Sequence, residues 1–202
     1  MKNKEILIKI LLMLRSNGIY NEEILFSVEK LPPHYYKNLL GSNYNNNNEQ
    51  NYFDELVRLL KILQYALAHR KKINNVLISN FKLGWYLIIS SLIAKRIYSI
   101  CSDKKQINDL EKIYKFLKIT NIYIKKSCNF FDWKKVAPFD LVVLFKKYNT
   151  IPDNCLNLLD KDGLLFFTKE NKNKVSIMKC NKNKNLEKLN INDFLLEENK
   201  IL

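Results

Sequence analysis

The sequence predicts a doubly wound α/β domain with a helical N-terminal region and a C-terminal pair of antiparallel strands. From residue 75 onward, short apolar segments alternate with helical patterns, the order that builds a parallel sheet covered by helices. These apolar segments are continuous rather than alternating, so both faces of the sheet should be buried. The chain has 202 residues, 47% of them hydrophobic, enough for one full core. We expect a single domain over 1–202, comprising helical region 1–70, α/β core 71–170 and strands 171–202.

Three helices are expected before the sheet. Apolar residues between Ile6 and Leu14 recur at helical spacing, and Gly18 is suited to end that helix. Asn21 can cap the second helix, which Pro32 terminates. The expected helices cover 4–16, about 22–31 and about 53–68, with an Asn-rich loop over 41–51.

Within the sheet region, turn and cap residues separate the elements. Asp103 can cap a helix, Pro152 can begin one, and Asp162-Gly163 predicts a turn. The expected strands cover 76–78, 96–100, 122–124, 139–145 and 164–167, and the expected helices cover 84–94, 103–117 and 152–159. The tail should add strands at 174–180 and about 190–196, joined by a polar linker over 181–189.

The net charge is +14, and two interpretations of it remain open. Only four of the 34 basic residues are arginine, whereas nucleic-acid surfaces favour arginine for bidentate contacts. Abundant Lys, Asn, Ile, Tyr and Phe together are typical of AT-rich coding. The alternative is salt-sensitive RNA contact through a Lys-rich surface. Candidate contact residues near predicted strand ends are Lys71, Lys72, Lys82, Lys146 and Lys147.

Several classes of protein are disfavoured. The four cysteines form no CxxC pair, so a zinc site is not expected, and we expect an intracellular protein with reduced thiols. The apolar run 85–94 has about half the length of a membrane span. The basic N-terminus is compatible with a mitochondrial presequence as well as with a structural helix.

Several short segments, taken in order, resemble the protein-L-isoaspartate O-methyltransferases over about 180 residues. These segments are Asn17-Gly18-Ile19, Val28 to Tyr36, Arg96 to Ile100, Asn121 to Ile124, Trp133, Ala137-Pro138-Phe139-Asp140, Ile151-Pro152 and Asp162 to Leu165. The resemblance implies a Rossmann-like S-adenosylmethionine (SAM) methyltransferase sheet with an N-terminal helical cap that helps to hold substrate.

The same resemblance indicates a degenerate SAM site. The family's glycine-rich loop corresponds to Asn80 through Gly84, where only the last glycine remains, and Phe81 and Leu83 add bulk. The ribose-binding acid at the end of the second strand corresponds to Cys101, whose thiol cannot accept two hydroxyl hydrogen bonds. The family's Gly-Asp-Gly after the third strand corresponds to Ser127-Cys128-Asn129. The degenerate cofactor positions are Asn80, Lys82, Gly84, Cys101 and Cys128.

No catalytic hydroxyl and no metal ligands can be assigned. The family's substrate motif, Thr-x-Ser-Gln-Pro, falls in the Asn-rich loop, where Ser42 is a poor substitute and no further Ser or Thr occurs before Ser79. Cys101 and Cys128 also permit a thiol pair or redox site, against the interpretation that both are small buried hydrophobic residues.

Three hypotheses of function follow. The first is a catalytically inactive relative without cofactor, a structural or binding component of a protein or ribonucleoprotein assembly, mitochondrial or cytosolic. The second is a divergent SAM-dependent enzyme of protein repair, with Lys82 at the cofactor carboxylate and Asp103 at the ribose. The third is a free-standing binder of isoaspartyl peptides.

Overall fold

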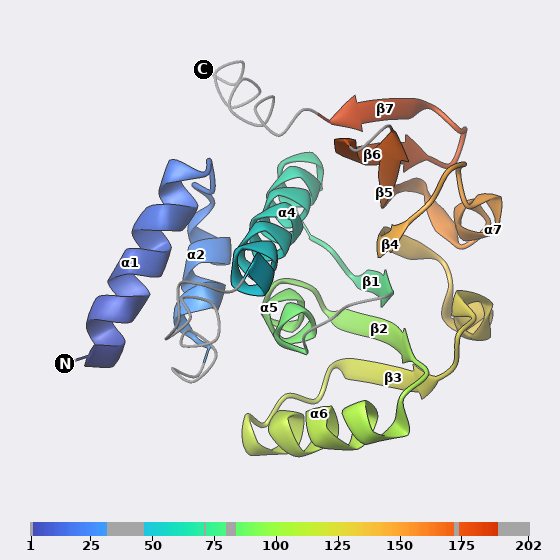
Figure 1. The fold of residues 1–202 in the computed structure, drawn as a ribbon. Helices are drawn as coiled ribbons and strands as arrows, with labels where there is room; N and C mark the ends of the chain where they lie inside the picture. The colour runs from blue at the N-terminus through green and yellow to red at the C-terminus, as the bar shows by residue number, and fades with distance from the viewer. Residues whose placement is uncertain (1, 32–46, 71, 80–83, 172–173, 190–202) are drawn as a thin grey trace.

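The computed structural model describes residues 2–31, 47–70, 72–79, 84–171 and 174–189 (Figure 1). The helices are α1 (Lys2–Ser16), α2 (Glu22–Glu29), α4 (Asn47–His69), α5 (Trp85–Ile93), α6 (Lys104–Phe116), the 3-10 helix η1 (Phe130–Val136) and α7 (Asp153–Leu156). The strands are β1 (Asn75–Ser79), β2 (Arg96–Cys101), β3 (Ile122–Lys126), β4 (Phe139–Lys147), β5 (Leu159–Asn171), β6 (Lys174–Asn181) and β7 (Leu186–Leu189).

The strands form one sheet in the order β3-β2-β1-β4-β5-β6-β7. Strands β1 to β5 pair in parallel, whereas β6 and β7 pair antiparallel at one edge. The chain runs outward from β1 to β3 and then returns to β4, which makes the sheet doubly wound. The predicted Rossmann-like fold is confirmed.

The two faces of the sheet are covered unequally. Helices α1, α2, α4, α5 and α6 lie on one side of the sheet and contribute with it to a single large apolar core. The other face packs against η1 and α7 around a smaller core that includes Tyr98, Trp133 and Phe139. Figure 1 shows α1, α2, α4 and α5 gathered on the same side of the sheet. Central strands buried on both faces explain the continuous apolar segments of the sequence.

The N-terminal helices match the predicted pattern but differ in one boundary. Ile10 and Leu14 of α1 are fully buried, so this basic segment is part of the folded domain. The prediction of a loop through residue 51 was wrong, because α4 begins at Asn47. Extending a helix adds one backbone hydrogen bond per residue once its packed part has formed, which offsets the low helix propensity of asparagine. Residues 41–46 lie outside the described residues.

The C-terminal half requires three corrections. The helix expected over 152–159 covers only Asp153–Leu156, and β5 begins directly at Leu159. Asp162-Gly163 forms an irregularity inside β5 rather than a turn, because Gly163 passes so close to the Phe139 carbonyl that a Cβ there would lie 2.6 Å from it. The predicted linker 181–189 contains β7, and the strand expected near 190–196 lies outside the described residues.

Two smaller findings complete the fold. The 3-10 helix η1 was not predicted, since only seven residues separate Asn129 from Ala137 and they carry no helical apolar stripe. Within the ranges described above, no helix combines the length and apolar character needed to cross a bilayer.

Candidate functional site at the carboxyl ends of the strands

The carboxyl ends of β1, β2 and β3 lie side by side at one edge of the sheet, where doubly wound folds bind ligands. Ser79 of β1 is level with Ile100 of β2, and Cys101 is level with Lys126 of β3. Of the predicted cofactor positions, Asn80 and Lys82 lie outside the described residues, as do Phe81 and Leu83. Gly84, Cys101 and Cys128 are described.

Gly84 stands directly before α5 and is the point of closest approach to α6. A Cβ built on Gly84 would lie 1.8 Å from one methyl carbon of Leu110. Its φ of −63° is available to any residue, so the glycine serves close packing and not an unusual backbone angle. Gly84 therefore lies where the start of α5 packs against Leu110 of α6.

Cys101 ends β2 and takes part in a local hydrogen bond. Its Sγ donates to Oε1 of Gln106 on α6, at 3.0 Å. Asp103 is the nearest carboxylate along the chain, and its Oδ1 accepts from the backbone N–H of Lys105 at 2.8 Å as the cap of α6. The end of β2 therefore presents a thiol that donates to an amide oxygen, where the family resemblance implies an acid. Gln106 was missed from the sequence because nothing there linked it to the end of β2.

The loop after β3 satisfies much of its own hydrogen bonding. The backbone N–H of Asn129 donates to the Ser127 hydroxyl at 2.9 Å. The side-chain oxygen of Asn129 accepts from the Phe131 N–H at 2.9 Å and caps η1. Cys128 between them is exposed, so its interpretation as a small buried hydrophobic residue was wrong. The side chains of Ser127 and Asn129 therefore stabilise the turn after β3 and the start of η1.

The cysteines are distributed one to an element or loop, and the four form no disulfide. Cys155 of α7 and Cys180 of β6 are fully buried in the core that faces η1. Burial raises the pKa of the Cys155 thiol to about 12. Within the part of the chain that the structure describes, no three His, Cys, Asp or Glu side chains converge as metal ligands.

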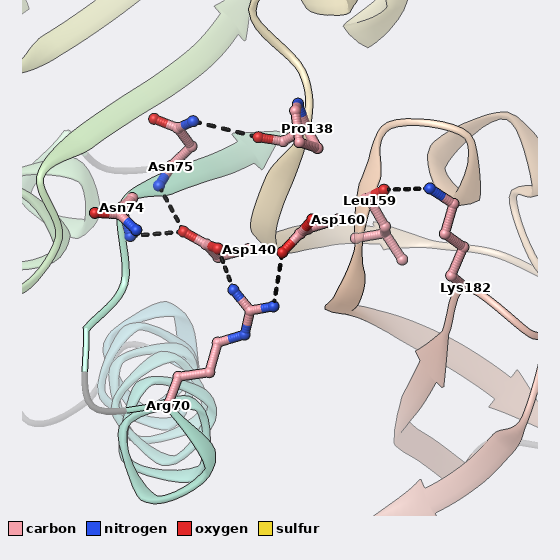
Figure 2. Close-up of polar contacts among 8 residues, drawn as sticks. All are labelled: Arg70, Asn74, Asn75, Pro138, Asp140, Leu159, Asp160 and Lys182. Atoms are coloured by element: carbon pink, nitrogen blue, oxygen red, sulfur yellow. Dashed lines mark hydrogen bonds and ion pairs between the residues drawn. The ribbon is translucent and has the colours of Figure 1, made fainter.

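A polar cluster lies at the opposite, amino-terminal edge of the sheet (Figure 2). Asp140 of β4 accepts from the backbone N–H groups of Asn74 and Asn75, at 2.6 and 2.9 Å, and from the Arg70 guanidinium. The same guanidinium donates to Asp160 of β5 at 3.0 Å. Asp140 belongs to the segment Ala137 to Asp140 that carried the family resemblance. It ties β4 to the start of β1 and to Arg70 at the end of α4, and Arg70 extends the cluster to Asp160 of β5.

Comparison with known proteins agrees with the Rossmann-like fold. No family model matches the chain. The protein-L-isoaspartate O-methyltransferase of Paramagnetospirillum magneticum is 22% identical over 165 residues, which cover 78% of this chain and 76% of that protein. The chain is protein-L-isoaspartate O-methyltransferase-like.

Two solved structures of this methyltransferase-like class have the same fold. One is a Plasmodium falciparum protein assigned as a protein-L-isoaspartate O-methyltransferase, in complex with S-adenosyl-L-homocysteine (SAH). It has a TM-score of 0.59 and 15% identity, covering 89% of this chain and 91% of that one. The other, a protein-L-isoaspartate O-methyltransferase, has a TM-score of 0.62 and 11% identity, covering 86% of this chain but 59% of that chain.

The described residues do not fit the ribose of SAM in the manner that the family resemblance implies. A ribose diol needs an acceptor for two O–H groups, which a carboxylate supplies. At the end of β2 this chain offers the Cys101 thiol, while one oxygen of Asp103 is engaged by Lys105. The side chains that follow β3 add no carboxylate before Asp132 of η1.

Proposed function

We propose that this methyltransferase-like protein has no methyl-transfer activity and acts as a structural or binding component of a larger protein or ribonucleoprotein assembly. The observation that carries the proposal is the hydrogen bond from Cys101 to Gln106, at the position where the family resemblance implies a ribose-binding acid. The loop after β3, whose Ser127 and Asn129 cap its own turn, supports it.

The packing contacts of the fold are the second line of support. Leu110 of α6 packs closely against Gly84 at the start of α5, and Asp140 accepts hydrogen bonds from Asn74 and Asn75. A chain that has these packing contacts but no carboxylate at the end of β2 is what we expect if selection has acted on the fold and not on methyl transfer. The charge of +14 favours an anionic partner, and a ribonucleoprotein assembly, mitochondrial or cytosolic, is one candidate host.

The decisive experiment is calorimetric titration of the purified, folded chain with SAM and with SAH. We expect no detectable heat at ligand concentrations of about 1 mM, where a complex of even −4 kcal/mol would be half-formed. A dissociation constant near 1 μM, about −8 kcal/mol, would overturn the proposal. The assembly part is tested separately by size fractionation of a native lysate, where recovery only as a free monomer would contradict it.

A divergent SAM-dependent protein-L-isoaspartate O-methyltransferase of protein repair is the second candidate. The similarity to the Paramagnetospirillum enzyme over 165 residues favours it. Asp103 would then use its second carboxylate oxygen for the ribose. Methyl transfer from SAM to an isoaspartyl peptide that is lost in Asp103→Asn, but kept in Asp109→Asn, a change at another exposed aspartate further along α6, would establish this function in place of the first.

A further inference from the structure

The outer face of edge strand β3 presents an exposed aromatic ring on a buried aromatic base. Tyr123 is 42% exposed, although its ring stacks on Tyr98 with centroids 5.3 Å apart and planes at 21°. Tyr98 itself is only 7% exposed. One face of the Tyr123 ring is therefore held by the protein, and the side chain remains open to solvent.

This ring rests on a rigid support. Tyr98 makes edge contacts with Trp133 of η1, at 4.9 Å, and with Phe139 of β4, at 5.5 Å. The Trp133 indole N–H donates to the Ser99 carbonyl at 2.9 Å, which ties η1 to the sheet. We call Tyr98, Tyr123, Lys125 and Trp133 the Tyr123 platform. Its geometry is fixed before any ligand arrives, which lowers the entropic cost of binding.

Positive charge surrounds the platform. Lys125 lies on the same face of β3 as Tyr123, about 7 Å along the strand. Its ammonium group is held 4.1 Å above the Trp133 ring and donates to the Asp132 carbonyl at 2.6 Å, which leaves two N–H groups for a ligand. Exposed Lys134 and Lys135 follow on η1. Asp132 is the single acidic side chain within β3 and η1.

We propose that the Tyr123 platform binds single-stranded RNA, with a base stacked on Tyr123 and backbone phosphates contacted by Lys125, Lys134 and Lys135. An exposed aromatic ring beside fixed lysines is the arrangement that binds unpaired bases, whereas duplexes hide their base faces. Asn129 is exposed and caps η1 through its oxygen, so its amide nitrogen can donate to a ribose 2′-hydroxyl.

This inference names a partner for the non-catalytic role proposed above, but it is carried by Tyr123, Lys125 and η1 and not by the hydrogen bond from Cys101 to Gln106. The lysines named from the sequence do not form this surface. Lys71 and Lys82 lie outside the described residues, as do the side chains of Lys146 and Lys147, and the described Lys72 lines a cavity of about 280 Å³ near α2 and α5. Because SAH titration tests the end of β2 and the RNA assay tests the Tyr123 platform, either experiment can fail while the other succeeds.

The test is fluorescence anisotropy of the full chain with labelled single strands of about 12 uridines, a length within the range of single-strand sites. Tyr123→Leu should weaken binding about fivefold to tenfold, since base stacking on the ring is lost, while Tyr123→Phe should bind like the wild type. Lys134→Gln/Lys135→Gln should lower the slope of affinity against salt by about 1.4. The matched control is Lys112→Gln/Lys115→Gln, which removes the same charge from exposed positions of α6 on the other face.

Four outcomes would overturn the proposal. If the two double variants lose the same affinity for RNA, binding depends on the net charge of the protein and not on this surface. An unchanged affinity in Tyr123→Leu, with the fold verified by circular dichroism, would exclude stacking. Equal or tighter binding of the matching DNA strand or of an RNA duplex would exclude single-stranded RNA as the partner. Binding of a poly-glutamate peptide with no binding of RNA would assign the surface to an acidic protein.

Discussion

Arg70, the residue after α4, forms an ion pair with Asp140 near the start of β4, seventy positions later in the chain. The Arg70 side chain is 19% exposed and that of Asp140 is 10% exposed. Because Asp140 also accepts from the N–H groups of Asn74 and Asn75, one carboxylate fixes where the helical region enters the sheet. Figure 2 shows these groups converging.

Removal of this carboxylate should destabilise the fold strongly. We expect Asp140→Ala to lower the free energy of unfolding by about 2–4 kcal/mol, because two backbone N–H groups lose their acceptor and the mostly buried Arg70 guanidinium loses one of its two carboxylate partners. Chemical denaturation followed by circular dichroism measures the change. Asp160→Ala is the control: its side chain is 35% exposed, and a loss above about 1 kcal/mol there would contradict the ranking.

The contribution of Asp160 should depend on pH. The hydrogen bond from Arg70 lowers the pKa of the Asp160 carboxyl below its ordinary value. A lowered folded-state pKa stabilises the fold above the unfolded pKa of about 3.9, and this stabilisation is lost as the pH falls through the folded value. The stability difference between the wild type and Asp160→Asn should therefore be constant above about pH 5 and shrink below about pH 4. A stability difference that grows as the pH falls would contradict a lowered pKa for Asp160.

Gly84 and Leu110 should be energetically coupled. Gly84→Ala is expected to cost about 1–3 kcal/mol, since the new Cβ would overlap the Leu110 side chain. Leu110→Ala should cost about 2–4 kcal/mol through the cavity it leaves. In the double variant the alanine side chain at position 84 occupies the space that Leu110 has vacated. The loss of unfolding free energy in the double variant should therefore be smaller than the sum of the two single losses, by at least about 1 kcal/mol. Simple additivity in denaturant titrations would count against this contact.

Asp103 should behave as a helix cap. Asp103→Ala is expected to lower the free energy of unfolding by about 1 kcal/mol, because the Lys105 N–H loses its acceptor. Asn21→Ala provides the matched control, since Asn21 caps α2 through the Ile24 N–H at 3.0 Å and is remote from the candidate site. We expect similar losses for both variants in thermal melts. A large change in SAH affinity confined to Asp103→Ala would assign the carboxylate to the cofactor instead.

The four thiols should react in an order set by exposure. Cys128 is exposed and should react fastest with a disulfide reagent, followed by the partly buried Cys101. Cys155 and Cys180 should react only on unfolding, since both are fully buried and the raised pKa of Cys155 suppresses its thiolate. Mass spectrometry after timed labelling reports the order. Early modification of Cys155 would show that α7 opens in the native state.

Local sequence predicted most elements of the sheet region. The runs around Val76 and Ile97 became β1 and β2, since apolar residues without alternation require burial on both faces, whereas the run around Ile122 became the partly exposed edge strand β3. The caps at Asn21 and Asp103 were also predicted, because their hydrogen bonds join residues two or three positions apart. Element boundaries that depend on distant contacts were not predicted correctly, as the early start of α4 and the position of β7 show.

The sequence by itself determined the strand–helix order, the caps and the presence of a thiol, Cys101, at the end of the second strand, since these depend on residue chemistry and on neighbours along the chain. Only the tertiary structure decided the partners. It placed Gln106 against Cys101, Arg70 against Asp140, and Tyr98 beneath Tyr123. Residues far apart in sequence meet because the sheet register and the helix crossings bring them together, and no local pattern encodes that geometry.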